Sequence, residues 1–118
     1  QEEVEELYRI NECFHAASDP KEKSGLDCSF HTRIAEISGN PCVVQYLSNL
    51  LLRQAVVATT FEDRPQRSRL SYVEHNGILQ ALELRDPELA AKQADIHFHM
   101  SQASLQSKLE AYLQKRSE

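Results

Sequence analysis

The stretch DPKEKSGLDCSFHTRIAEISGNP, residues 19–41, decides the fold of the chain. It opens with Asp19-Pro20, which places a capping side chain before a proline at the first helical position. It closes with Gly39-Asn40-Pro41, which combines a glycine stop, a capping asparagine and a second proline start. The stretch therefore predicts one helix at about 20–38 and the beginning of another at about 41.

Helical signals continue on both sides of this stretch. Only three glycines occur in the 118 residues, and no segment shows the sustained alternation of a strand. Asp86-Pro87 repeats the cap-and-proline start, and apolar residues at helical spacing predict further helices at about 1–18, 41–61, 65–85 and 87–115. Asn76-Gly77 would suggest a turn when read locally, but the flanking apolar residues keep helical phase across it. Five helices with short loops predict an all-α fold, an antiparallel helical bundle.

The composition is that of an ordinary globular domain, with 41% hydrophobic and 26% charged residues. The formal net charge of -5 repels phosphate backbones, which makes the segment a poor candidate for binding nucleic acid by itself. The three cysteines match no metal-binding spacing and follow no signal peptide, so we expect reduced thiols and a cytoplasmic location. Residues 42–61 are long enough to span a membrane, but Gln45, Asn49 and Arg53 favour a helix buried in the domain.

Asp27 and His31 form the first candidate pair of metal ligands. They lie four residues apart, which places them about 40° apart around a helix and one turn above each other. A carboxylate and an imidazole in this arrangement can reach a single ion. Taken alone, such a pair is more often a hydrogen bond at the surface.

Two further histidines are predicted to face the interior. His75 lies within the apolar stripe of its helix, where an imidazole needs a partner, either an ion or a neighbouring polar side chain. His97 shares its face with small residues, which leave room for an ion and a ligand. One aspartate and three histidines suit Zn²⁺, Ni²⁺, Mn²⁺ or Fe²⁺ and suit Ca²⁺ poorly. A five- or six-coordinate ion would keep positions open for a carboxylate-bearing small molecule.

Arg53 is a charged residue on an otherwise apolar helix face, with Tyr46 and Asn49 near it on the helical wheel. A guanidinium there needs an anionic partner. It can extend to the surface, pair with an acid on another helix, or hold the carboxylate of a bound effector. We place Arg53, Tyr46 and Asn49 together as candidate effector-binding residues.

These residues also carry a family resemblance over about residues 4–105. The chain resembles the FCD effector domain, the C-terminal half of FadR-like regulators in the GntR family. The matching segments are Asp27-Cys-Ser-Phe30-His31, Ile34-Ala35-Glu36, Ser38-Gly39-Asn40-Pro41, Arg53, Glu74-His75, Ile78-Leu79, Ala81, Asp86, Ala90 and His97.

The resemblance implies a helical bundle that encloses a cavity for a metal and a ligand. The resemblance further implies that a divalent transition metal, with Zn²⁺ or Ni²⁺ preferred, is bound by Asp27, His31, His75 and His97. It also implies that Arg53 faces a small organic acid. It also implies a homodimer in the full protein, and DNA contact only through an N-terminal winged helix-turn-helix domain that this chain lacks. Residues 1–118 are then an effector-binding domain whose opening helix is missing.

We therefore expect a sensor domain, without enzyme activity and without a membrane partner, whose effector alters DNA binding by the absent domain. Two other hypotheses stay open. A three-histidine, one-carboxylate site with open positions could activate water in a metalloenzyme, with Glu74 as the nearest general acid or base. Alternatively, the chain is a metal-free interaction bundle whose histidines are ordinary polar residues.

Overall fold

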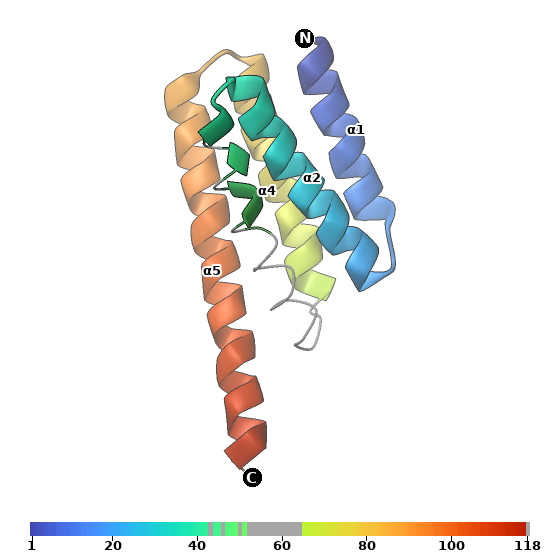
Figure 1. Cartoon of the computed structure of the whole chain (residues 1–118), viewed down its shortest axis with the longest axis vertical. Coiled ribbons are helices and arrows are strands. Elements are labelled where there is room, and N and C mark those ends of the chain that lie inside the picture. The colour runs from blue at the N-terminus through green and yellow to red at the C-terminus, as the bar shows by residue number, and fades with distance from the viewer. Residues whose placement is uncertain (43, 46, 50, 52–64, 118) are drawn as a thin grey trace. The chain divides into compact units, whose positions relative to one another are not determined.

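The computed structural model describes residues 1–42, 44, 45, 47–49, 51 and 65–117. The labelled helices of this part of the chain are α1 (Glu2–Ala16), α2 (Pro20–Ser38), α4 (Pro65–Glu83) and α5 (Pro87–Ser117) (Figure 1). The described residues between 41 and 51 are helical as well. Strands are absent from the described part of the chain, so the prediction of an all-α fold is confirmed. The second half of the helix predicted at 41–61 lies outside the described residues, and the enclosed cavity stays a prediction.

The chain divides into two compact units, residues 1–59 and residues 60–118. In the first unit α1 packs against α2, and in the second α4 packs against α5. The predicted antiparallel pairing of neighbours follows within each unit from the short connections at residues 17–19 and 84–86. Among the helices so described, none has the length and hydropathy needed to cross a membrane.

The helix boundaries are set by the residues that the sequence singles out. Gly39 ends α2 in the left-handed conformation, with φ of 82°, a region that glycine enters without steric cost. The Asn40 side chain then accepts a hydrogen bond from the backbone N–H of Cys42 at 3.0 Å. In the same way, the Asp86 carboxylate accepts a hydrogen bond from the backbone N–H of Leu89 at 3.0 Å. Asp19 is also an N-cap residue, but its side chain makes no capping hydrogen bond, so that detail of the prediction is wrong.

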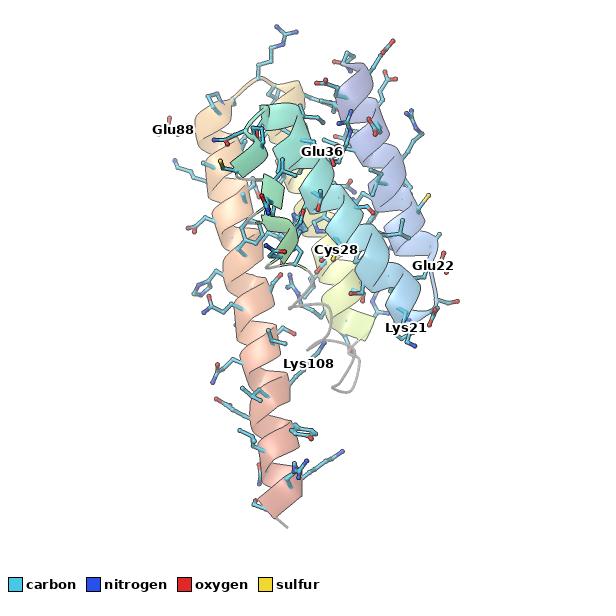
Figure 2. All side chains as sticks on the ribbon, in the orientation of Figure 1. Lys21, Glu22, Cys28, Glu36, Glu88 and Lys108 are labelled. Atoms are coloured by element: carbon cyan, nitrogen blue, oxygen red, sulfur yellow. The ribbon has the colours of Figure 1, made fainter. Side chains whose placement is uncertain are left out.

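The first unit is held by an apolar seam between α1 and α2. Leu7 and Phe14 of α1 and Phe30 of α2 are buried. Polar contacts flank the seam: Arg33 Nε donates to Glu6 Oε1 at 3.0 Å. Cys28, labelled in Figure 2, lies on another side of α2. Its Sγ is 3.7 Å from the carbonyl oxygen of Leu51. The seam fixes α2 about its own axis and thereby fixes where the side chains of its other faces point.

The second unit is a helical hairpin of α4 and α5. As predicted, α4 runs unbroken across Asn76-Gly77. Leu79 and Ala81 are fully buried on its inner face. Gly77 meets α5 closely, because a Cβ built there would lie 3.0 Å from Oε1 of Gln93. The hairpin therefore brings the middle of α4 against the first half of α5, which is where His75 and His97 are found.

Candidate metal centre

The first candidate pair lies on α2 in the first unit. Nε2 of His31 is 3.3 Å from Oδ1 of Asp27, as the spacing of four residues predicts. The His31 side chain is only 5% exposed, whereas that of Asp27 is 30% exposed. The ring of Phe30 meets the His31 ring edge-on at 5.2 Å between centroids. Because the imidazole is buried, this pair is not the surface hydrogen bond that the sequence alone left open.

The second candidate pair joins α4 to α5 within the second unit. His75 and His97 are 0% and 2% exposed, so the prediction that both face the interior is confirmed. Their Nε2 atoms are 3.2 Å apart, and their rings meet edge-on with centroids 4.6 Å apart. His99, two residues after His97, is exposed, as its place on the opposite side of α5 predicts.

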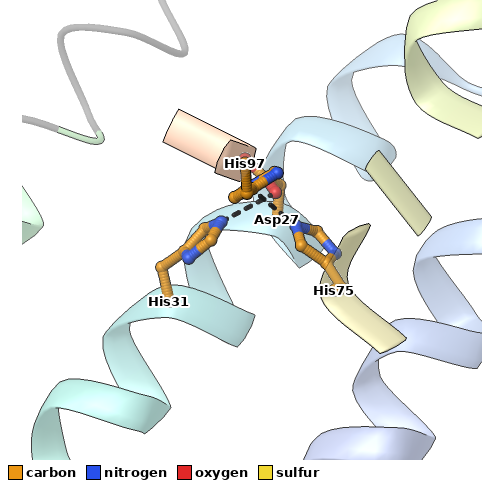
Figure 3. Close-up of side chains that lie close together, drawn as sticks. All are labelled: Asp27, His31, His75 and His97. Atoms are coloured by element: carbon orange, nitrogen blue, oxygen red, sulfur yellow. Dashed lines mark hydrogen bonds and ion pairs between the residues drawn. The ribbon is translucent and has the colours of Figure 1, made fainter. Parts of the chain in front are cut away.

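The spacing of the donor atoms suits a transition-metal ion. With metal–nitrogen bonds of about 2.0–2.1 Å, neighbouring ligand atoms lie about 3.0 Å apart at octahedral angles and about 3.4 Å apart at tetrahedral angles. The distances of 3.3 Å in the Asp27–His31 pair and 3.2 Å in the His75–His97 pair fall in this range. Figure 3 draws both pairs, and the four side chains make up a group of potential metal ligands.

Glu74 and Arg67 extend the second pair through an array of hydrogen bonds. Oε1 of Glu74 lies 2.7 Å from Nδ1 of His97. Arg67 forms an ion pair with the same carboxylate. Its Nη1 lies 3.2 Å from Oε2 of Glu74, and its Nη2 donates to Oγ of Ser101 on α5 at 3.1 Å. One carboxylate of α4 is thus held by a cation of its own helix and faces a histidine of the next.

The environment of Glu74 favours its ionised form. Burial raises the pKa of this carboxyl, but hydrogen bonds with Arg67 and His97 and the charge of Arg67 outweigh burial and hold the pKa below its usual value. The sequence suggested Glu74 only as a general acid or base of the alternative enzyme. A usable signal was present: Arg67 precedes Glu74 by seven residues, which places both on one face of a helix.

Only one of the three candidate effector-binding residues lies within the described part of the chain. Arg53 and Tyr46 lie outside the described residues. Asn49 is helical and exposed. A role for any of the three in effector binding stays a prediction.

The helices and the ligand set together define a helical domain with a candidate transition-metal site. The family model described as FCD domain matches residues 1–100. The chain belongs to this family, the ligand-sensing domains of GntR-type transcription regulators. No curated protein and no solved structure matches it.

Proposed function

We propose that this sensor domain binds one divalent transition-metal ion through Asp27, His31, His75 and His97. The ion, together with Arg53, would hold a small organic acid, and its binding would alter DNA binding by an attached N-terminal domain. The observation that carries the proposal is the presence of two preformed ligand pairs. Each is largely buried and has the donor spacing of a metal site.

One shared ion is favoured over two separate ions by coordination chemistry. Each pair supplies only two donor atoms, whereas protein sites for Zn²⁺ and similar ions use three or four protein ligands. Three imidazole nitrogens and one carboxylate oxygen make a mixed set that suits Zn²⁺ or Ni²⁺. Ca²⁺ would need six to eight oxygen ligands, which this set lacks.

A shared ion would also explain how the domain senses an acid. An ion that accepts five or six ligands keeps positions open beyond the four from the chain, and a carboxylate oxygen can fill them. Binding of the ion and the acid would favour one arrangement of the helical bundle over another. Coupling between two sites of this kind is about 1–3 kcal/mol, enough to change DNA affinity by about 5–150-fold.

The environment of Glu74 speaks against the metalloenzyme alternative. A general base works best with a pKa near the operating pH and a position from which it can take a proton. The Glu74 carboxylate is instead engaged by Arg67 and His97, and its pKa is lowered. Assays with a panel of esters and phosphoesters test this point: turnover that depends on Glu74 would favour the enzyme.

Metal stoichiometry tests the proposal directly. Purified wild-type chain should bind one Zn²⁺ per chain in a dialysis or mass-spectrometric titration. Asp27→Ala/His31→Ala and His75→Ala/His97→Ala should each lose that ion. The matched control is His15→Ala/His99→Ala, which removes two exposed histidines and should leave the stoichiometry at one.

Three results would contradict the shared site. If each double variant retained an ion, the pairs would bind separately. If wild type and the His75→Ala/His97→Ala variant held equally little metal, the site would not exist. A chelator that leaves the Tm of the wild-type chain unchanged would support the metal-free bundle, because an ion bound only by the native state must stabilise it.

A further inference from the structure

We propose that Glu74 is a positioning residue of the metal site, which fixes the tautomer of His97 so that Nε2 is the nitrogen offered to the ion. This inference rests on the proposed metal site and assigns a role to a residue outside the four ligands. Its basis is the contact between Glu74 Oε1 and His97 Nδ1 at 2.7 Å.

The Glu74 carboxylate is paired with the Arg67 guanidinium, and a carboxylate so paired accepts hydrogen bonds and has no proton to donate, so the proton in this contact belongs to Nδ1 of His97. In the neutral ring the second nitrogen, Nε2, then carries a lone pair and no proton. Nε2 is also the atom that lies 3.2 Å from Nε2 of His75. The contact with Glu74 therefore directs the lone pair of His97 toward the second histidine, where a shared ion would sit. A carboxylate at the far nitrogen also raises the basicity of a ligating imidazole.

Arg67 and Ser101 hold the Glu74 carboxylate in this orientation. Arg67 contacts both oxygens of Glu74, and its Nη2 reaches Ser101 on α5, one helical turn beyond His97. The side chains of Arg67 and Glu74 are 12% and 15% exposed, which means that solvent competes little with their pairing. The carboxylate is thus fixed from α4 and α5 at once, and the His97 ring has a preferred rotation before any ion binds.

A purely structural role for Glu74 makes a different prediction. In that case Glu74 serves only as the counter-ion of Arg67, and the state of the His97 ring is incidental. Removing the charge would then destabilise the hairpin, but it would leave the tautomer of His97 and the intrinsic affinity for Zn²⁺ unchanged in the folded protein.

The tautomer can be measured without any metal. In the chelator-treated wild-type chain at neutral to mildly alkaline pH, ¹⁵N NMR of the imidazole rings should show His97 protonated at Nδ1 and unprotonated at Nε2. Glu74→Ala should lose this preference. Glu74→Gln, whose amide oxygen can still accept the hydrogen bond, should retain it, whereas the counter-ion role predicts that Gln and Ala act alike. A wild-type His97 protonated at Nε2 would overturn the inference, even if every variant failed to fold.

The second measurement is the affinity for Zn²⁺, taken by competition with a chelating dye. Glu74→Ala should weaken binding by about 10–100-fold, and Glu74→Gln by less. Glu83→Ala, which removes an exposed glutamate from the same helix, is the matched control and should bind like wild type. His97→Ala serves as the reference for loss of a ligand.

The outcomes separate this inference from the proposed function. If His97→Ala weakens Zn²⁺ binding and folded Glu74→Ala does not, the metal site stands and the role of Glu74 is overturned. If neither wild type nor any variant binds Zn²⁺, the proposed function itself fails and the inference falls with it.

Discussion

Two glycines inside helices allow the structure to be tested with a single added methyl group. Replacing glycine by alanine in a helix interior stabilises the folded state by about 0.8–1.0 kcal/mol. Gly25 of α2 is exposed, and a Cβ there would meet nothing within 4 Å. We therefore expect Gly25→Ala to raise the free energy of unfolding by about 1 kcal/mol.

Gly77 of α4 should respond differently because α5 is close. A Cβ at this position would lie 3.0 Å from Oε1 and 3.4 Å from Cδ of Gln93. The amide end of Gln93 must move by a few tenths of an ångström, and holding a side chain away from its preferred rotamer costs about 0.5–1.5 kcal/mol. This cost offsets much or all of the gain in helix propensity, so the free energy of unfolding of Gly77→Ala should lie between about 0.7 kcal/mol below and about 0.5 kcal/mol above that of wild type, short of the gain at Gly25.

The assay is urea denaturation of the chelator-treated chain, followed by circular dichroism. Gln93→Ala supplies the second arm of a double-mutant cycle: in that background Gly77→Ala should recover the full gain of about 1 kcal/mol. Gly39→Ala is the opposite control and should lower stability by about 1–2 kcal/mol, because its φ of 82° is unfavourable for alanine. A full gain from Gly77→Ala with Gln93 present would refute the α4–α5 contact described above.

Metal binding, helix capping and thiol reactivity can each be measured on the same purified chain. Zn²⁺ at one hundred times its dissociation constant should stabilise the native state by about 2.7 kcal/mol, seen as a rise in Tm that EDTA reverses; an unchanged Tm argues against the site. Asp86→Ala should lower the free energy of unfolding by about 1 kcal/mol in urea titrations, because the Asp86 carboxylate caps α5. Asp19→Ala should lower it far less, because the Asp19 side chain makes no capping hydrogen bond. Equal losses in the two variants would contradict this difference. Iodoacetamide should alkylate Cys28 more slowly than the exposed Cys13 and Cys42. The reason is that burial, aided by the charge of Asp27, raises the pKa of the Cys28 thiol. Equal alkylation rates of the three cysteines, measured by mass spectrometry, would contradict this prediction.

Local sequence signals were sufficient to predict the described helices because each boundary depends on a few adjacent residues. Pro20 and Pro87 each begin a helix, and Gly39 ends one. These signals act through backbone sterics and first-turn hydrogen bonds, which need no knowledge of the tertiary fold. The capping bond of Asp19 failed as a prediction because side-chain rotation at an exposed N-cap is not set by residue type alone.

The same distinction between local signals and tertiary contacts applies to the candidate site. The Asp27–His31 contact follows from helix geometry, and the spacing of four residues was enough to predict it. The inward direction of His75 followed from the apolar residues around it. The contact of Glu74 with His97 could not be predicted, because it depends on how α4 and α5 are aligned along each other. Periodicity shows which face of a helix is buried, but it does not show which residue of the neighbouring helix lies opposite.

That alignment is what the second ligand pair depends on. His75 and His97 both lie eleven residues from Asp86 in the connection, one before it and one after it, as expected for opposite positions in an antiparallel hairpin. A slip of α5 by one residue would move His97 by about 1.5 Å and 100° and would separate the two Nε2 atoms. Contacts on both sides of the pair oppose such a slip: Gly77 with Gln93 nearer the connection, and Arg67 with Ser101 farther from it. The Asp27–His31 pair needs no such support, since both side chains share one helix. In the proposed site, metal affinity would thus be most sensitive to changes in the contact between α4 and α5, including changes at residues that never touch the ion.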